Sequence, residues 1–169
     1  MLSKTIQMAL NDQISKESNA SNFYLSMASW CDKTGLPGSA KFLYEHSSRE
    51  RGHMMKLFRY VNDAGGHAVK RELKDPPFEF KSLIEVFELT HQHEIEVTQS
   101  INAVVDLCLK EKDHSTFNFL QWFVAEQHEE ERLFKSILDK IKIIGLDGRG
   151  IYWIDKEIGK LADKMPEEK

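Results

Sequence analysis

Apolar residues recur at intervals of three and four along four long stretches of this sequence, the spacing of residues that share one face of an α-helix. These stretches predict helices over about residues 3–32, 39–64, 82–111 and 113–144. The spacing returns briefly at about residues 151–162, which predicts a short amphipathic fifth helix. We therefore expect an all-α protein in which residues 1–169 form a single domain, with its helical bundle at about 3–144.

Residues that cap or stop helices stand at each predicted boundary. Ser82 and Glu85 form a capping box at the start of the third helix. Ser39 is the predicted N-cap of the second helix, and Asp113 or Ser115 that of the fourth. Helix stops are expected at three glycine-containing positions: Thr34-Gly35-Leu36-Pro37-Gly38, Gly65-Gly66 and Gly145.

The link between the second and third helices, about residues 65–81, is unusually long and contains Pro76-Pro77. The second helix would be about 39 Å long at about 1.5 Å per residue. About 17 extended residues reach up to about 56 Å, enough to run the full length of such a helix. The short links on either side make antiparallel pairs, so we expect a four-helix bundle with one long crossover between helices two and three.

Polar side chains interrupt each apolar seam near its middle, where the helices of an antiparallel bundle lie at a similar height. The seams contain, in order along the four helices, Leu10, Gln13, Glu17, Ala20, Tyr24, Met27 and Cys31; Leu43, His46, Glu50, His53, Leu57, Tyr60 and Ala64; Phe87, His91, Glu94, Thr98, Ile101, Val105 and Cys108; and Leu120, Phe123, Gln127, Glu130, Phe134, Ile137, Ile141 and Ile144. An unpaired charge in a bundle core would cost several kcal/mol, so carboxylates from all four helices indicate a bound cation.

The ligand types predict which cation. Carboxylates with one imidazole and no thiolate suit a divalent ion such as Fe(II), Mn(II) or Zn(II). Glu50 and His53 share one helix face at a spacing of three. With Glu17, Glu94 and Glu130, the glutamates supply four negative charges, which two divalent ions would neutralise. Two iron ions sharing a carboxylate can deliver two electrons to O₂ together.

Composition excludes several other classes. With 41% hydrophobic and 30% charged residues the chain is expected to fold, and a net charge of −4 argues against nucleic acid as a partner. Cys31 and Cys108 lack metal or redox spacing and are expected to be buried apolar residues. We find no signal peptide and no apolar run long enough to span a membrane, so we expect a soluble, cytoplasmic protein.

These motifs carry a family resemblance over essentially the whole chain. The run 117–131, Phe-Asn-Phe-Leu-Gln-Trp-Phe-Val-Ala-Glu-Gln-His-Glu-Glu-Glu, together with Glu17, Tyr24, Glu50-x-x-His53 and Glu94, resembles the bacterial non-haem ferritins of the ferritin-like di-iron superfamily. The resemblance implies a homo-oligomeric hollow shell of 24 subunits that oxidises Fe(II) with O₂ or hydrogen peroxide. It implies iron storage and detoxification as a ferric oxyhydroxide mineral, and contacts of the fifth helix at the four-fold axes of the shell.

The resemblance also assigns the candidate site. Glu17, Glu50 and His53 would surround one iron, and Glu50, Glu94 and Glu130 the other. Two further residues complete the assignment: Gln127 as a near or weak ligand that orders an oxygen species, and Tyr24 as an electron donor or hydrogen-bond partner. By default, the remaining seam or nearby histidines have structural or surface roles: His46, His91 and His128.

Two departures from relatives modify this picture. Haem-binding relatives carry a second Glu-x-x-His on the fourth helix and a methionine directly after the glutamate of the second. This chain has Gln127-x-x-Glu130 and Arg51 at those places, so we expect no haem. Many relatives form a third iron site with a glutamate just before the one matching Glu50, where this chain has Arg49. Glu126 and Glu129 remain, so we expect a weakened or absent third site.

Other functions remain open at this point. A di-metal carboxylate oxidase or oxygenase of the same superfamily, acting on another substrate, is the principal alternative, although such enzymes tend to be longer. A metal-free helical interaction module would tolerate leucine at Glu17 and Glu50. A smaller DNA-protecting shell protein would place its metal site between subunits, often with a basic tail, whereas the predicted polar tail 166–169 is acidic.

Overall fold

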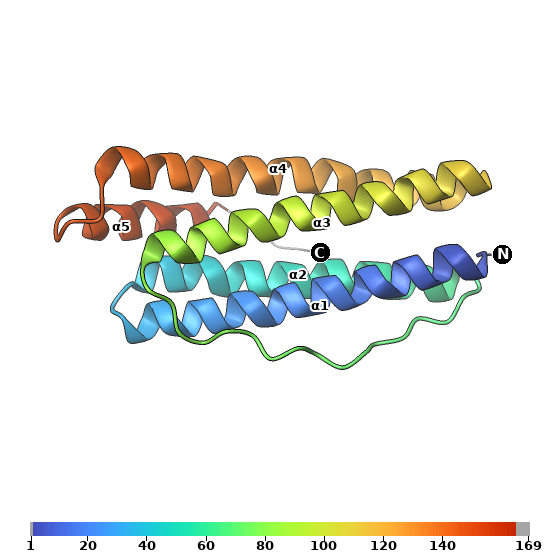
Figure 1. Cartoon of the computed structure of the whole chain (residues 1–169), viewed down its shortest axis with the longest axis horizontal. Coiled ribbons are helices and arrows are strands. Elements are labelled where there is room, and N and C mark those ends of the chain that lie inside the picture. Colours follow the sequence, from blue (N-terminus) through green and yellow to red (C-terminus); the bar gives the residue numbers. More distant parts are fainter. Residues whose placement is uncertain (1, 165–169) are drawn as a thin grey trace.

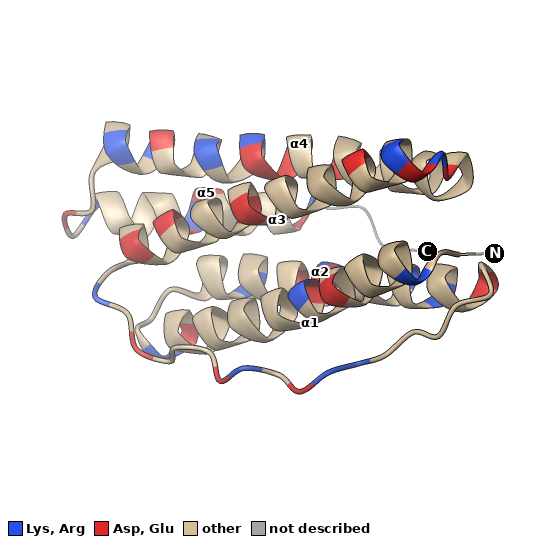
Figure 2. Ribbon diagram, turned by 45° about the vertical axis from the view of Figure 1, so that its right-hand side comes forward, with Lys and Arg blue, Asp and Glu red and all other residues tan. Residues whose placement is uncertain are grey.

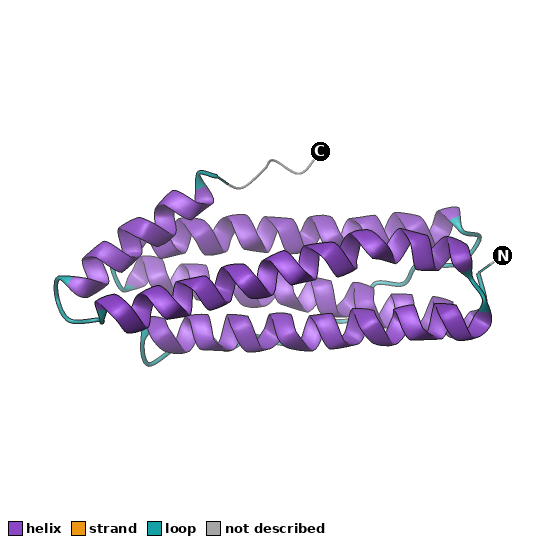
Figure 3. Ribbon diagram, turned by 90° about the horizontal axis from the view of Figure 1, so that it is seen from above, coloured by secondary structure: helices purple, strands orange, loops and turns teal. Residues whose placement is uncertain are grey.

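The computed structural model describes residues 2–164, and the predicted polar tail lies outside them. Five helices occur in this range: α1 (Lys4–Lys33), α2 (Pro37–Asp63), α3 (Leu83–Glu111), α4 (His114–Ile144) and α5 (Gly150–Ala162). Helices α1 to α4 lie side by side, and α5 is inclined to them (Figures 1 and 3). The all-α prediction and the four-helix bundle with a fifth short helix are confirmed, and residues 2–164 contain no strand.

The crossover runs the length of the bundle along α1 (Figure 1). Polar side chains of α1 hold it in place through its backbone. Asn11 donates to the carbonyl of His67 and accepts from the amide of Val69, both at 3.0 Å. Farther along, Ser26 donates to the carbonyl of Pro77 at 2.6 Å. These contacts satisfy backbone groups that a crossover without secondary structure would otherwise leave to water.

Most predicted helix boundaries are confirmed. Ser3 accepts a hydrogen bond from the amide of Ile6, Ser82 from that of Glu85, and Asp113 from that of Thr116. The predicted cap of α2 is wrong, because the helix begins at Pro37 and Ser39 lies within its first turn. Proline suits this position because its fixed φ is already helical and it has no amide hydrogen to satisfy.

The capping group of α2 comes instead from α5. The Asp155 carboxylate, which is buried, accepts from the amides of Gly38 at 2.9 Å and Ser39 at 2.7 Å. A Cβ on Gly38 would lie 2.1 Å from the carbonyl oxygen of Asp155, so only glycine permits this approach. A residue more than 110 positions away in the sequence therefore fixes where α2 begins.

Two apolar clusters fill the bundle, and the four seam glutamates lie between them. On α1, Glu17 falls between Ile14 of one cluster and Tyr24 of the other. The corresponding gaps on the other three helices contain Glu50, Glu94 and Glu130. The free thiols Cys31 and Cys108 are buried within the clusters, as predicted. Acidic and basic residues are both distributed along the helices and the crossover (Figure 2).

Candidate metal centre

Three predicted ligands from two helices meet at the middle of the bundle. One ligand atom each of Glu17, Glu50 and His53 lies within 4.8 Å of the others, and all three residues are buried. His53 Nδ1 lies 3.4 Å from Glu50 Oε2 and 3.9 Å from Glu17 Oε2. Two carboxylates and one imidazole so close together form a donor set typical of a divalent cation.

The orientation of Glu17 is set by a hydrogen-bonded chain that reaches the surface between α1 and α3. Lys16 donates to Ser100 at 2.5 Å, Ser100 to Gln13 at 2.5 Å, and the Gln13 amide to Glu17 Oε1 at 2.6 Å. Glu17 Oε2 is buried and accepts no hydrogen bond from the described residues. One oxygen of Glu17 is thus held in place while the other accepts no such bond, and hydrogen bonds from outer partners orient metal ligands in this way.

Glu94 lies across the bundle and is held by two of the predicted site residues. Tyr24 donates its hydroxyl to Glu94 Oε1, and Gln127 donates to Glu94 Oε2 at 2.9 Å. The Tyr24 ring makes T-shaped contacts with the rings of His46 and His93 and a tilted contact with Phe134. Tyr24 and Gln127 therefore both contact a candidate ligand.

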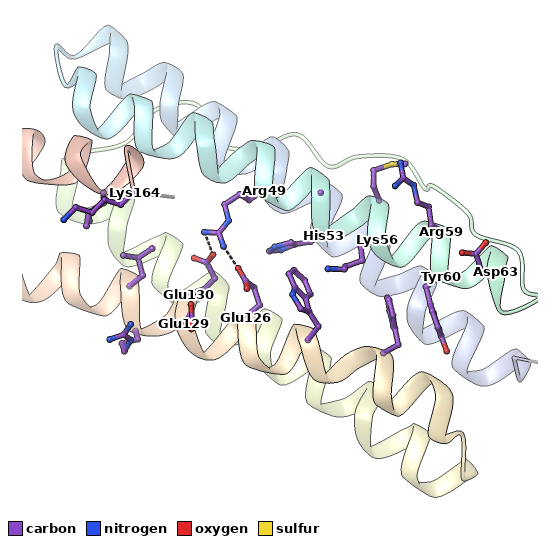
Figure 4. Close-up of a pocket in the computed structure, with 17 residues that line it drawn as sticks. Arg49, His53, Lys56, Arg59, Tyr60, Asp63, Glu126, Glu129, Glu130 and Lys164 are labelled. Carbon is purple, nitrogen blue, oxygen red and sulfur yellow. Dashed lines mark hydrogen bonds and ion pairs between the residues drawn. The ribbon is translucent and has the colours of Figure 1, made fainter. Parts of the chain in front are cut away.

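Glu130 also has a partner at each oxygen, but one of these partners carries a fixed positive charge. His46 Nε2 lies 3.0 Å from Oε2, and Arg49 lies 2.9 Å from Oε1. Arg49 also forms an ion pair with Glu126 one turn before Glu130 (Figure 4). His46 is fully buried. The structural or surface role that the sequence predicted for it omits this direct contact with a candidate ligand.

The electrostatics of the four glutamates separate them into two groups. Burial raises the pKa of Glu17 well above its usual value, and nearby Glu50 raises it further. Burial likewise raises the pKa of Glu50, and raises that of Glu94 to about 8, with a further contribution from Glu130. Burial opposes ionisation of Glu130 too, yet His46 and Arg49 hold its pKa below the usual value. A divalent cation would replace protons at the first three carboxyl groups.

Some predicted ligands thus meet directly, whereas others lie apart. Glu17, Glu50 and His53 form one group, while Glu94 and Glu130 are engaged by protein partners. The predicted third-site residues lie at the edge: Glu126 is paired with Arg49, and Glu129 is exposed. Sequence reasoning assigned no role to Gln13, although its position four residues before Glu17 on the same seam was a usable signal.

A groove of about 880 Å³ opens between α2 and α4 beside these residues (Figure 4). Its lining includes His53 and Glu130 of the centre, with Trp122 beside the His53 ring at 5.3 Å between centroids. Uncharged side chains and charged ones of both signs line the rest, the charged residues being Arg49, Lys56, Arg59, Asp63, Glu126, Glu129, Arg132 and Lys164. The groove therefore borders two residues of the otherwise buried centre with charged, aromatic and aliphatic side chains.

A four-helix bundle with one long crossover and buried glutamates from all four helices defines the class of ferritin-like di-metal carboxylate proteins. The model of the family described as a ferritin-like domain matches residues 7–144. None of the described helices is long and apolar enough to cross a membrane.

Known ferritins are similar to this chain in sequence or structure over nearly its full length. A probable bacterial non-heme ferritin-like protein of Haemophilus influenzae is 51% identical over 97% of this chain and 99% of its own. A bacterial non-heme ferritin of Campylobacter jejuni is 51% identical over 96% and 97%. Among solved structures, an open pore ferritin of the archaeon Archaeoglobus fulgidus has a TM-score of 0.92 at 39% identity, covering 94% of this chain and 98% of that one. Chlorobium tepidum ferritin has a TM-score of 0.84 at 48% identity, covering 95% and 98%. The chain therefore belongs to the ferritin family, among the bacterial non-haem ferritins, which are iron-storage proteins.

Proposed function

We propose that this ferritin oxidises Fe(II) at a di-iron ferroxidase centre within its own bundle and stores the ferric product as an oxyhydroxide mineral. The observation that carries the proposal is the buried group of Glu17, Glu50 and His53, whose ligand atoms lie within 4.8 Å of one another. Buried carboxylates without a cation would destabilise the core, so their presence is best explained by binding of the iron substrate.

The resemblance to the family supplies the proposed residue roles. Glu17, Glu50 and His53 would bind one Fe(II). Glu50 would also bind the second Fe(II), together with Glu94 and Glu130. Each iron gives one electron, and O₂ accepts both with two protons to form hydrogen peroxide, or peroxide accepts them to form water. Because the two electrons leave together, the reaction avoids release of a one-electron oxygen radical.

Two further residues act close to these ligands. Gln127, which donates to Glu94, would be a weak ligand or hydrogen-bond donor to an oxygen species. Tyr24 also donates to Glu94 and lies among buried rings, a position suited to an electron donor or a positioning residue. Burial and the nearby Glu94 raise the pKa of Tyr24 well above the usual value, which keeps its hydroxyl protonated as a donor.

Storage requires a shell, and we propose a homo-oligomer of 24 subunits. The exposed apolar residues near α5 support a subunit contact there. Tyr152 and Trp153 are 54% and 55% exposed on α5, and Ile143 at the end of α4 is 84% exposed. Large apolar side chains so exposed on a single chain are typical of an interaction surface.

We further propose a cytoplasmic, haem-free protein with a weakened or absent third iron site. Arg51 follows Glu50 where haem-binding relatives have a methionine. The ion pair between Arg49 and Glu126 supports the loss of the third site, because a fixed positive charge already engages one of its two remaining carboxylates. Three tightly bound irons per subunit would contradict this proposal.

The test is aerobic addition of Fe(II) to the purified protein, with ferric absorbance and particle size recorded together. Rapid oxidation and a hollow particle are expected. Glu50→Gln should slow oxidation strongly, whereas Glu45→Gln, an exposed glutamate on the same helix, should not. A monomer that leaves iron oxidation at the buffer rate would refute the proposal. Rapid oxidation without mineral would instead favour a di-metal oxidase acting on another substrate.

A further inference from the structure

The ion pairs of Arg49 cross the groove between α2 and α4 (Figure 4). From α2, its guanidinium lies 2.9 Å from Glu130 Oε1 and also pairs with Glu126, both on α4. The side chains of Arg49, Glu126 and Glu130 are 15%, 17% and 2% exposed. Because these charges are largely removed from water, their attraction is less screened than that of a surface pair.

This contact makes the two halves of the centre unequal. Glu17 keeps a buried oxygen that accepts no hydrogen bond from the described residues, so the first half offers an available ligand atom. Glu130 offers none, because His46 engages one oxygen and Arg49 the other. A cation at the second half must therefore compete with the guanidinium for Glu130 Oε1, and the two positive charges repel each other.

We propose that Arg49 is a latch on the second metal position, so that the two positions fill in order. The first divalent ion binds at Glu17, Glu50 and His53, and the second binds only when Arg49 releases Glu130. The inference rests on the proposed function, because it assumes that these residues bind metal. Its new element is that a side chain outside the ligand set determines the affinity of one position.

The surroundings give the released guanidinium a second place to lie. Arg49 is already paired with Glu126, and the exposed Glu129 lines the same groove. The latch can therefore open by a side-chain movement that keeps one ion pair. The cost of opening is loss of the charged hydrogen bond to Glu130, which should weaken the second ion by about tenfold or more.

Calorimetric titration with Zn(II), a redox-inert probe, tests the latch on the assembled full-length protein. The wild type should bind two ions in separate phases, the second at least about tenfold weaker. Arg49→Gln keeps much of the side-chain length without the charge, so it should strengthen the second phase by about tenfold and leave the first nearly unchanged. Arg49→Lys keeps the charge but loses the two-pronged contact, so an intermediate affinity is expected.

Two control variants test whether the effect is specific to Arg49 and which residues the second phase depends on. Arg132→Gln removes an exposed positive charge from the same groove and should change the second phase by less than about twofold. Glu94→Gln should remove the second phase and preserve the first. An equal effect of Arg132→Gln and Arg49→Gln would overturn the latch in favour of general charge repulsion.

Failure of the latch is distinguishable from failure of the proposed function. Two equal Zn(II) phases in the wild type, or an unchanged second phase in both Arg49 variants, would overturn the latch even if iron oxidation is rapid. Absence of any Zn(II) binding that depends on Glu17 or Glu50 would overturn both proposals. Arg49→Lys keeps the test decisive if Arg49→Gln does not assemble.

Discussion

Replacement of Glu94 by glutamine should stabilise the metal-free protein, and the gain should depend on pH. Burial raises the pKa of this carboxyl to about 8, against the value of 4.5 that is usual for an exposed glutamate. Glutamine cannot ionise and matches the protonated carboxyl in shape. The carbonyl oxygen of the introduced glutamine can still accept the hydroxyl hydrogen of Tyr24. The side-chain amide of Gln127 can rotate so that its oxygen accepts a hydrogen bond from the NH₂ group of the introduced glutamine.

The direction of this pH dependence follows from how many protons the folded and unfolded chains bind. Below about pH 4.5 the carboxyl is protonated in the folded and unfolded chains, and its burial carries no ionisation penalty. As pH rises, the unfolded chain ionises first, so wild-type stability falls until the folded carboxyl also ionises near pH 8. The resulting penalty is about 1 kcal/mol at pH 5, about 3 kcal/mol at pH 7 and about 5 kcal/mol at pH 9. Glu94→Gln removes this penalty.

Calorimetric unfolding of chelator-treated protein at pH 5, 7 and 9 measures the difference in stability between Glu94→Gln and wild type. Subunit assembly contributes equally to both proteins, so it cancels in this difference. Glu88→Gln, an exposed glutamate on the same helix, is the matched control and should show little difference at any of these pH values. With excess Zn(II) the wild type should become more stable than Glu94→Gln, because only the wild type has the full set of metal ligands. A gap between Glu94→Gln and wild type that is independent of pH, or a less stable variant, would refute the reasoning.

Three other predictions concern neighbouring contacts. Zn(II) binding at pH 7 should release at least about one proton per subunit, because burial raises the pKa values of Glu17 and Glu94; titration in two buffers of different ionisation enthalpy measures it, and zero release would contradict the prediction. Gln13→Leu should weaken the first Zn(II) phase by about tenfold, since Glu17 loses its orienting donor, and an unchanged first phase in the same titration would exclude this role. Asp155→Ala should lower the free energy of unfolding by about 1–2 kcal/mol and speed hydrogen exchange at the start of α2, whereas unchanged exchange there would show that the cap is dispensable.

The sequence by itself determined the fold and the approximate position of the centre. A spacing of three and four fixes which side chains share a helix face, so periodicity alone assigns Glu17, Glu50, Glu94 and Glu130 to the interior. The length of the crossover determined the relative direction of the helices. Both inferences depend on local periodicity and chain length, which the sequence states directly.

Only the tertiary structure decided which partners each buried oxygen meets. Asp155 caps α2 from a distant helix, His46 and Arg49 engage Glu130, and Gln13 holds Glu17. These contacts depend on the separation of neighbouring helices and on side-chain rotamers, and helical periodicity specifies neither. The sequence marked Arg49 as a departure from the family pattern, but only the packing of α2 against α4 placed its charge on Glu130.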